Sequence, residues 1–225
     1  MRLIYIYRIF LDLKSVRRGD GPVERQSEWA RNGTTASAAG KAEEPPIGEA
    51  QLLKRGKSEA RGVRIVPARE EDLSEIAEIY AHARREMIRQ GNPGQWGDSY
   101  PSSALTREDW ETGRLYVLRD EDGLCAVFVF SIGDEPTYRH IEAGDWLSDA
   151  PYGTLHRVAS AGRRRGVFPL MVEFCAQRIG HLRIDTHADN ARMRRLIVRA
   201  GFRECGIIRV RGGAPRIAYE RLSEN

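Results

Sequence analysis

Cysteine is scarce in this sequence, and its few copies lie far apart. The 225 residues contain three cysteines, Cys125, Cys175 and Cys205, with no Cys-x-x-Cys pair. An odd number of isolated cysteines argues against a disulfide framework and indicates a reducing compartment. We therefore expect a cytoplasmic protein.

Long apolar runs are also missing. No stretch of about 18 or more apolar residues occurs, so the sequence predicts no membrane span. The N-terminal segment RLIYIYRIFLDL is broken by Arg8 and Asp12, and no signal-peptide cleavage site follows it. Three interpretations of this segment stay open: a short amphipathic helix, an anchor at a membrane surface, or an over-long gene start. The arginine-rich composition downstream is typical of a GC-rich gene and favours the third.

Lysine is absent from most of the chain. All four lysines lie before residue 58, and every later basic residue is arginine. The net charge of +4 is unevenly spread, because residues 1–60 hold 11 basic and 8 acidic residues, against 25 and 24 in residues 61–225. The C-terminal part is nearly neutral, which disfavours nucleic acid as a partner.

The first 60 residues contain little that could form a core. The stretch NGTTASAAGKAEEPPIGEA is small, polar and interrupted by proline and glycine, with no periodicity. We predict a disordered, low-complexity extension over residues 1–60. From residue 61 to 222, apolar residues recur with the periods of strands and helices, and we predict a single domain there.

Strands and helices alternate along residues 61–222. Period-two and apolar runs predict strands over residues 63–68, 115–120, 124–132, 153–160, 182–186, 205–211 and 216–222. Helical spacing predicts helices over residues 70–91, 167–180 and 193–200. A loop rich in Gly, Pro and Trp precedes the second strand, and the last two strands form a hairpin around GGAP. This order predicts an α/β fold with mixed strand directions.

The stretch AGRRRGVF, residues 161–168, joins a predicted strand to the following helix. Such a loop directs unpaired backbone N–H groups and the positive end of the helix at one point. Gly166 tolerates unusual backbone angles, and the three arginines add charged donors. The stretch indicates a phosphate site, with a solvated arginine turn as the alternative.

Residues 63–222 resemble the GNAT superfamily of acyl-CoA-dependent N-acetyltransferases. Residues 163–168 correspond to the family motif [Q/R]-x-x-G-x-[G/A] except at the last position, and THADNARMRRLIVRAGF (186–202) is similar to its asparagine, helix and Gly-Phe segment. RIVPAREEDLSEIAEIY (64–80) is typical of its N-terminal strand and helix. The three segments in order are more specific than the motif alone. The resemblance implies one GNAT-like domain with a central mixed, mostly antiparallel sheet flanked by helices.

The resemblance implies acetyl-CoA as co-substrate. It places the pyrophosphate on Arg163, Arg164, Arg165, Gly166, Val167 and Phe168. The pantetheine arm is expected along the backbone of Arg157, Val158 and Ala159. The N–H of Val158 would polarise the thioester carbonyl, and Asn190 matches the family asparagine near the sulfur. The implied reaction is direct attack of a deprotonated amine on the thioester, without an acyl-enzyme.

Two positions depart from the family pattern. Phe168 stands where the family has Gly or Ala, so its ring either turns into the core or crowds the diphosphate. Many members carry a tyrosine along the helix after the asparagine, which protonates the departing thiolate. The stretch Arg195-Leu196-Ile197 has none. A water, another residue or unaided departure of the thiolate then has to replace it.

Several acidic and histidine residues are candidates for proton transfer. His156, on the predicted strand 153–160, suits a base or proton shuttle, with a structural histidine as the alternative. Asp185 and His187 share one face of a strand end and either form a carboxylate–imidazole pair or only shape the loop. Asp189 is expected to cap the next helix. His181, His187 and Asp189 match no strong ligand spacing, so no metal is predicted.

The acceptor side is expected to use residues from two other segments. Glu142, in TYRHIEAGDWLSD, is the first choice for a base acting through water, with a solvated glutamate as the alternative. Trp96 and Tyr100, in QWGDSYP, either line an acceptor pocket or close the core over the first helix.

The leading hypothesis is acetyl transfer to a primary amine of a small molecule, peptide or protein. The first alternative is a CoA-binding or sensing module with weak catalysis, which Phe168 and the missing tyrosine motivate. A less favoured alternative is an RNA-directed acetyltransferase that uses the arginine loop. The resemblance also allows a homodimer, and the sequence does not identify the acceptor.

Overall fold

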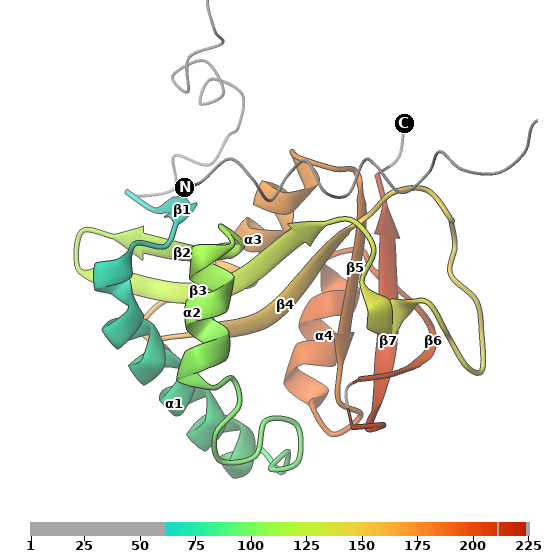
Figure 1. Cartoon of the computed structure of the whole chain (residues 1–225), viewed down its shortest axis with the longest axis horizontal. Coiled ribbons are helices and arrows are strands. Elements are labelled where there is room, and N and C mark those ends of the chain that lie inside the picture. The colour runs from blue at the N-terminus through green and yellow to red at the C-terminus, as the bar shows by residue number, and fades with distance from the viewer. Residues whose placement is uncertain (1–61, 211, 224–225) are drawn as a thin grey trace, which may run out of the picture. The chain divides into compact units, whose positions relative to one another are not determined.

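The computed structural model describes residues 62–210 and 212–223, and the predicted extension over residues 1–60 lies outside them. The helices are η1 (Glu70–Asp72), α1 (Leu73–Arg89), α2 (Ser103–Glu111), η2 (Pro136–Tyr138), α3 (Val167–Ala176) and α4 (Ala191–Arg199) (Figure 1). The strands are β1 (Arg64–Pro67), β2 (Leu115–Asp120), β3 (Gly123–Ile132), β4 (Gly153–Ser160), β5 (His181–Thr186), β6 (Arg203–Arg209) and β7 (Pro215–Leu222).

The described strands form a seven-stranded sheet in the order β1-β2-β3-β4-β5-β7-β6. The β4–β5 pair is parallel, and every other neighbouring pair in this sheet is antiparallel. Helix α3 makes the crossover that a parallel pair requires. The predicted mixed, mostly antiparallel sheet is confirmed. The sequence alone did not indicate that β7 lies between β5 and β6.

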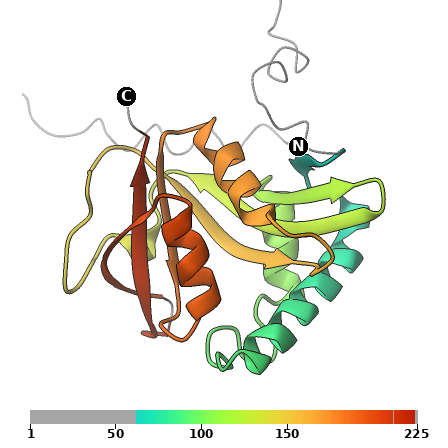
Figure 2. The same cartoon turned by 180° about the vertical axis from the view of Figure 1, so that it is seen from behind.

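Helices cover both faces of the sheet. α1 and α2 lie on one face, and α3 and α4 lie on the other (Figures 1 and 2). In β3, Val127 and Val129 pack with α1, whereas Phe128 and Phe130 pack with α3. A strand covered on both faces is apolar throughout, because successive side chains point to opposite faces. This explains the uninterrupted run LCAVFVF.

Helix α2 was not predicted, and the loop rich in Gly, Pro and Trp therefore ends earlier than expected. The hydroxyl of Ser102 accepts a hydrogen bond from the Leu105 N–H (3.2 Å) and caps the helix. A serine directly after Pro101 is the usual signal for a helix start. The helix buries Asp109, which proves important for the site.

β4 leaves β5 after a short paired stretch. The two strands pair only from Gly153 to Leu155, against residues 182–184. In β4, the register against β3 then shifts around Phe128, and Arg157 adopts φ +50°. An extra residue of this kind bends a strand and increases its twist. Residues 156–160 of β4 therefore run beside β3 but apart from β5.

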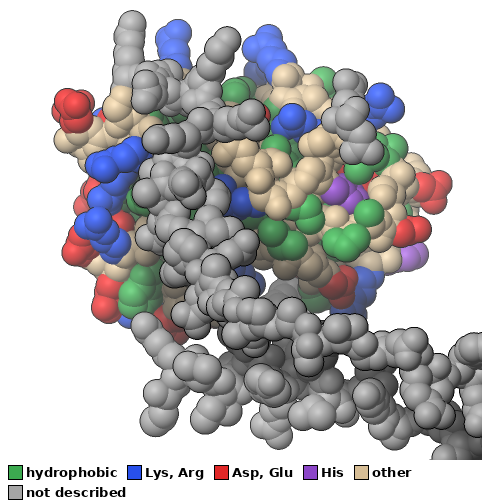
Figure 3. Space-filling view, turned by 90° about the horizontal axis from the view of Figure 1, so that it is seen from above, with side chains coloured by type: hydrophobic (Ala, Val, Ile, Leu, Met, Phe, Trp, Pro, Cys, Tyr) green, Lys and Arg blue, Asp and Glu red, His purple; other side chains and the backbone are tan. Residues whose placement is uncertain are grey.

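The surface mixes charges of both signs. In the view of Figure 3, basic and acidic side chains lie beside one another along the edges of the molecule. All three cysteines are buried free thiols. No helix within residues 62–210 and 212–223 has the length and apolar content that a membrane crossing needs.

Gly153 tests how tightly the start of β4 is packed. A Cβ added there would lie 2.6 Å from the Phe130 ring and 2.8 Å from the Ile179 side chain. We expect Gly153→Ala to lower the free energy of unfolding by about 1–3 kcal/mol, as other overpacked cores do. Gly94→Ala is the control, because a Cβ there meets nothing within 4 Å. Urea denaturation measures both, and equal midpoints would contradict the packing described.

Candidate active site

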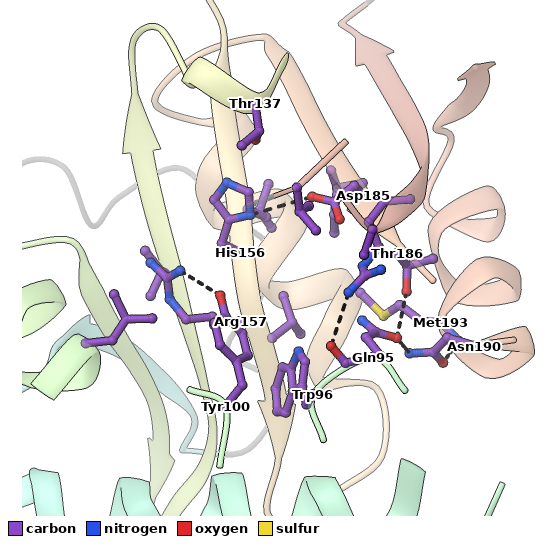
Figure 4. A pocket seen from close by; sticks show the side chains of 18 of the residues that line it. Gln95, Trp96, Tyr100, Thr137, His156, Arg157, Asp185, Thr186, Asn190 and Met193 are labelled. Carbon is purple, nitrogen blue, oxygen red and sulfur yellow. Dashed lines mark hydrogen bonds and ion pairs between the residues drawn. The ribbon is translucent and has the colours of Figure 1, made fainter. Parts of the chain in front are cut away.

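A cavity of about 550 Å³ opens where β4 and β5 separate. Its walls come from the middle of β4, the end of β5, the start of α4, the loop after α1 and the turn between β6 and β7. Segments far apart in the sequence therefore meet at one place (Figure 4). The bend in β4 creates this space, because β5 would occupy it if the two strands stayed paired beyond Leu155.

His156 lies between two carboxylates in this cavity. Its Nε2 is 3.3 Å from Glu135 Oε2, and its Nδ1 is 3.7 Å from Asp185 Oδ1. The Tyr138 hydroxyl donates to Asp185 Oδ1 (2.8 Å), and Thr137 donates to Glu135 through its N–H and its hydroxyl. One nitrogen of the imidazole is therefore within hydrogen-bond distance of Glu135, the other lies near Asp185, and both acids are themselves held in place.

Burial and hydrogen bonding change the acidity of this group. The bond from His156 lowers the pKa of Glu135 to about 2, against the opposing effect of burial. Burial raises the pKa of Tyr138 well above its usual value, and the nearby charge of Asp185 adds to this. Glu135 is therefore a carboxylate and Tyr138 a neutral donor at neutral pH, so Glu135 is an anionic neighbour of His156.

Arg157 occupies the bend of β4 and is fixed by α2. Its Nη2 lies 2.8 Å from Asp109 Oδ1, and its Nη1 donates to the Tyr100 hydroxyl (3.1 Å). Asp109 is fully buried and is also 3.3 Å from Arg114. Burial raises the pKa of Asp109, although the charge of Arg157 opposes this. The ion pair anchors a residue whose positive φ is unfavourable for any side chain.

Asn190 begins helix α4 and faces the cavity. Its Oδ1 accepts from the Met193 N–H (3.0 Å), and its Nδ2 donates to Gln95 Oε1 (2.9 Å). The same oxygen accepts from Asn92 Nδ2 (2.8 Å), so Gln95 connects the loop after α1 to the start of α4. Asn190, and not the predicted Asp189, is the helix cap. The side-chain oxygen of Asn190, directly after Asp189, is the one that accepts from the N–H of the third residue of α4, Met193.

The arginine loop is held against the β2–β3 hairpin. Arg163 donates to the carbonyls of Leu124 (3.0 Å) and Gly123 (2.5 Å) and to Asp120 (2.6 Å). Arg164 lies 3.6 Å from Asp120. These side chains position the loop, so their guanidinium groups are directed to protein acceptors. Arg165 is exposed, and its side chain forms no hydrogen bond or ion pair with another described residue.

Gly166 and Phe168 settle the shape of the loop. Gly166 has φ +75° and forms the N-cap of α3, in the left-handed conformation that its side-chain-free backbone permits. A Cβ at this position would meet nothing within 4 Å, so the space beside it is open. Phe168 is 3% exposed and belongs to the core cluster with Met171. Of the two alternatives for Phe168, the ring turns into the core. Val167, also predicted on the cofactor, is buried as well.

Glu142, the residue predicted as a base acting through water, is not among the residues that line the cavity. Its carboxylate is bound by Arg209 through Nε (3.1 Å) and Nη2 (3.0 Å), and its backbone pairs with Ile207. The bond from Arg209 lowers the pKa of Glu142. A carboxylate that is ion paired and absent from the cavity lining is poorly placed to accept a proton there.

Asp185 and His187 do not pair, although they follow one another on the same face of the strand end. Asp185 contacts Tyr138 and His156, whereas His187 Nδ1 accepts from the Asp189 N–H (3.2 Å). The loop after β5 turns His187 away, and β4 supplies the imidazole instead. No cluster of three or more His, Cys, Asp or Glu side chains suited to a metal occurs among residues 62–210 and 212–223.

Trp96 and Tyr100 both line the cavity, and Trp96 also packs in the core against α1. Trp96 is 8% exposed and contacts the Tyr80 ring edge-on, with centroids 5.7 Å apart. Tyr100 is more exposed and contacts Trp96 at 6.0 Å. The two expectations for this pair are therefore compatible. Val158 lines the cavity, while Ala159 is buried behind it against α1.

Four residues of the site were missed from the sequence: Gln95, Asp109, Glu135 and Arg216. Glu135 lies on a loop before a proline and carries no motif, and it reaches His156 only because the chain folds back after β3. Asp109 could not be identified from the sequence, because helix α2, which carries it, was not predicted. Gln95 lies beside Trp96 in the sequence, and only the fold brings its side chain to Asn190 and Asn92.

The lowered pKa of Glu135 should make the free energy of unfolding depend on pH in the acidic range. Because its pKa is about 2 in the folded protein and 4.5 as a reference, the unfolded chain binds more protons in between. The stabilisation is present above about pH 5 and is lost as the pH falls towards about 2. We expect Glu135→Gln to flatten this part of the unfolding free energy against pH. Glu111→Gln, at an exposed site, is the control. Identical slopes in both variants would contradict the assigned contact.

Comparison with known proteins gives matches at the level of structure. No protein-family profile matches the chain, and no curated protein matches its sequence. A GNAT-family acetyltransferase from Streptococcus agalactiae 2603 is similar, with 26% identity and a TM-score of 0.66 over 72% of this chain and 96% of that chain. A GNAT-family acetyltransferase from Listeria monocytogenes 4b F2365 shares the fold, with 18% identity and a TM-score of 0.54 over 71% and 94%.

These matches cover nearly the full length of both solved proteins. The chain is a member of the GNAT superfamily of acetyltransferases.

Proposed function

We propose that the protein transfers an acetyl group from acetyl-CoA to a primary amine in a ternary complex. The observation that carries this proposal is the gap between β4 and β5, which opens into a cavity beside an imidazole oriented by two carboxylates. Such a gap offers an unpaired strand edge to an extended ligand, and the imidazole offers a proton acceptor. Membership of the GNAT superfamily supplies acetyl-CoA as the donor.

The residues around the gap fit acetyl-CoA. The first N–H groups of α3 have no helical partners, and the open space at Gly166 leaves room for a diphosphate beside them. Arg165 is exposed at the same place and can add a charged donor. Arg163 and Arg164 would contact the diphosphate through their backbone N–H groups, because their side chains interact with Asp120 in the β2–β3 hairpin. The pantetheine arm would follow residues 157–159 of β4.

Acetyl transfer needs two proton movements around one bond exchange. The amine nitrogen forms a bond to the acetyl carbon, and the bond from that carbon to sulfur breaks. An ammonium group must first lose a proton, and the departing thiolate gains one. We assign the first role to His156, with Glu135 and Asp185 orienting its ring and stabilising its charged form. The backbone N–H of Val158 is the proposed donor to the developing oxyanion.

Asn190 contributes by position in this proposal. Its amide is fixed between Met193 and Gln95 and lines the wall of the cavity formed by α4. It keeps the loop after α1 close to the reaction space. Trp96 and Tyr100 would then bound the acceptor, since both lie on that loop.

The acetyl-CoA site is tested by isothermal titration of acetyl-CoA into the full chain. We expect Arg165→Ala to weaken binding about tenfold or more, because a hydrogen bond to a charged group contributes about 1.5–3 kcal/mol. Arg85→Ala, an exposed arginine on α1, should leave binding unchanged. Both variants should keep the wild-type melting temperature. Absence of acetyl-CoA binding by the wild-type protein would overturn the proposed function.

The role of His156 is tested by the release of free CoA in the presence of an amine panel. We expect His156→Gln to lower kcat/KM by about 10²–10⁴ while the Kd for acetyl-CoA stays unchanged. His140→Gln is the matched control, because His140 is exposed and outside the cavity. An unchanged rate in His156→Gln would remove His156 from the reaction. Binding of acetyl-CoA by the wild type without transfer to any amine would favour the sensing module.

A further inference from the structure

Arg216 is a buried cation that meets only neutral protein acceptors. Arg216 is the second residue of β7, and its side chain lines the cavity. The residue is 9% exposed. Its Nη2 donates to the carbonyl of Gln95 (3.1 Å) and its Nη1 to the carbonyl of Pro215 (2.9 Å). Among residues 62–210 and 212–223, no carboxylate lies within 4.0 Å of it. A guanidinium has about five N–H donors, so donors remain for a ligand.

Arg183 and Arg157, by contrast, are each paired with a carboxylate. Arg183, which is 4% exposed, has Glu220 opposite it on β7 and lies 2.8 Å from that carboxylate. Arg157 has Asp109 at 2.8 Å. The residue opposite Arg216 on β6 is Ile208, and β5 ends before it reaches this position. The fold thus supplies a carboxylate for Arg183 and for Arg157, whereas Arg216 has no carboxylate within ion-pair distance among the described residues.

Arg216 lies on the same face of the sheet as Asp185. Asp185 is opposite Ala218, and Arg216 is two residues from Ala218 along β7. Such diagonal neighbours lie roughly 7–8 Å apart and share a face. Asp185 in turn is 3.7 Å from His156. The cavity wall therefore carries an acidic end, around His156, beside a basic end at Arg216.

A buried guanidinium without an anion is an unfavourable arrangement. Burial lowers the pKa of Arg216, and the charge of Asp185 opposes this only in part. Removing a charge from water requires a partner, and the planar fork of arginine matches the two oxygens of a carboxylate. The bonds to Gln95 and Pro215 fix the guanidinium before any ligand arrives, so little freedom is lost on binding.

We propose that the acceptor is a free amino acid, whose carboxylate binds Arg216 while its amino group lies beside His156. This inference rests on the proposed acetyl transfer and narrows its acceptor. The separation of the acidic and basic ends suits an amine and a carboxylate joined by a few bonds. An internal peptide unit or a simple alkylamine has no carboxylate at that place and leaves the cation unpaired. The aromatic side chains of Trp96 and Tyr100 then face the remainder of the acceptor.

The test compares each of the twenty amino acids with its carboxamide, as the acceptor for acetyl-CoA with the full chain. We expect at least one amino acid to be acetylated with kcat/KM about 30-fold or more above that of its amide, since the amide leaves Arg216 unpaired. In Arg216→Met, this preference should fall to about threefold or less. The Kd for acetyl-CoA should stay within about threefold of wild type, and the preference is measured as the ratio of acid to amide within each variant. Arg221→Met, on the same strand but outside the cavity, should keep the full preference.

The outcomes separate this inference from the function on which it rests. Equal use of acids and amides by the wild type, or an equal loss of both in Arg216→Met, would overturn the carboxylate site and leave acetyl transfer standing. Binding of acetyl-CoA with transfer only to amines that lack a carboxylate would also overturn it. A protein that does not bind acetyl-CoA fails the proposed function itself.

Discussion

The short pairing between β4 and β5 is the constraint on which the rest of the molecule depends. Parallel strands that paired along their whole length would leave no space at the centre of this sheet. Here the extra residue at Arg157 bends β4 away after three paired positions, and the backbone at that residue is in a costly left-handed conformation. The bond from Arg157 to the buried Asp109 of α2 stabilises the bend. The opening is therefore maintained from the face of α1 and α2, opposite the helix that begins at Gly166.

Three charged groups around the sheet show how differently the fold treats buried charge. Glu220 receives Arg183 and His181 and lies far along β7, where it holds the segment before β4 through the Leu147 N–H. Asp109 serves the bend of β4. Arg216 has neutral acceptors alone. Buried ion pairs are poor sources of net stability, so the first two are best understood as fixing geometry. The unpaired cation at the cavity is the one whose partner is expected from outside.

Much of the fold was predictable from particular patterns. The apolar run of β3, the acidic start of α1 and the apolar spacing of α3 each identified an element, because burial leaves its pattern in the sequence. The arginine loop was found, but the roles of its arginines were not separable, since nothing local indicates that Arg163 reaches back to Gly123 and Asp120. Glu142 was selected because aromatic residues surround it in the sequence. In the structure its carboxylate is bound by Arg209 of β6. Helix α2 was missed although Ser102 marked its start.

The sequence by itself determined every strand of the sheet, the helices α1, α3 and α4, the mixed strand directions and the glycine at the start of α3. These follow from local periodicity and from the backbone freedom of single residues. Only the tertiary structure decided which acid meets His156, which arginine is left without an anion, and that Phe168 turns inward. Those outcomes depend on strand order and on a single bulge in β4. Both are set by packing between segments as much as 121 residues apart, as in the contact of Gln95 with Arg216, and leave no period in the sequence.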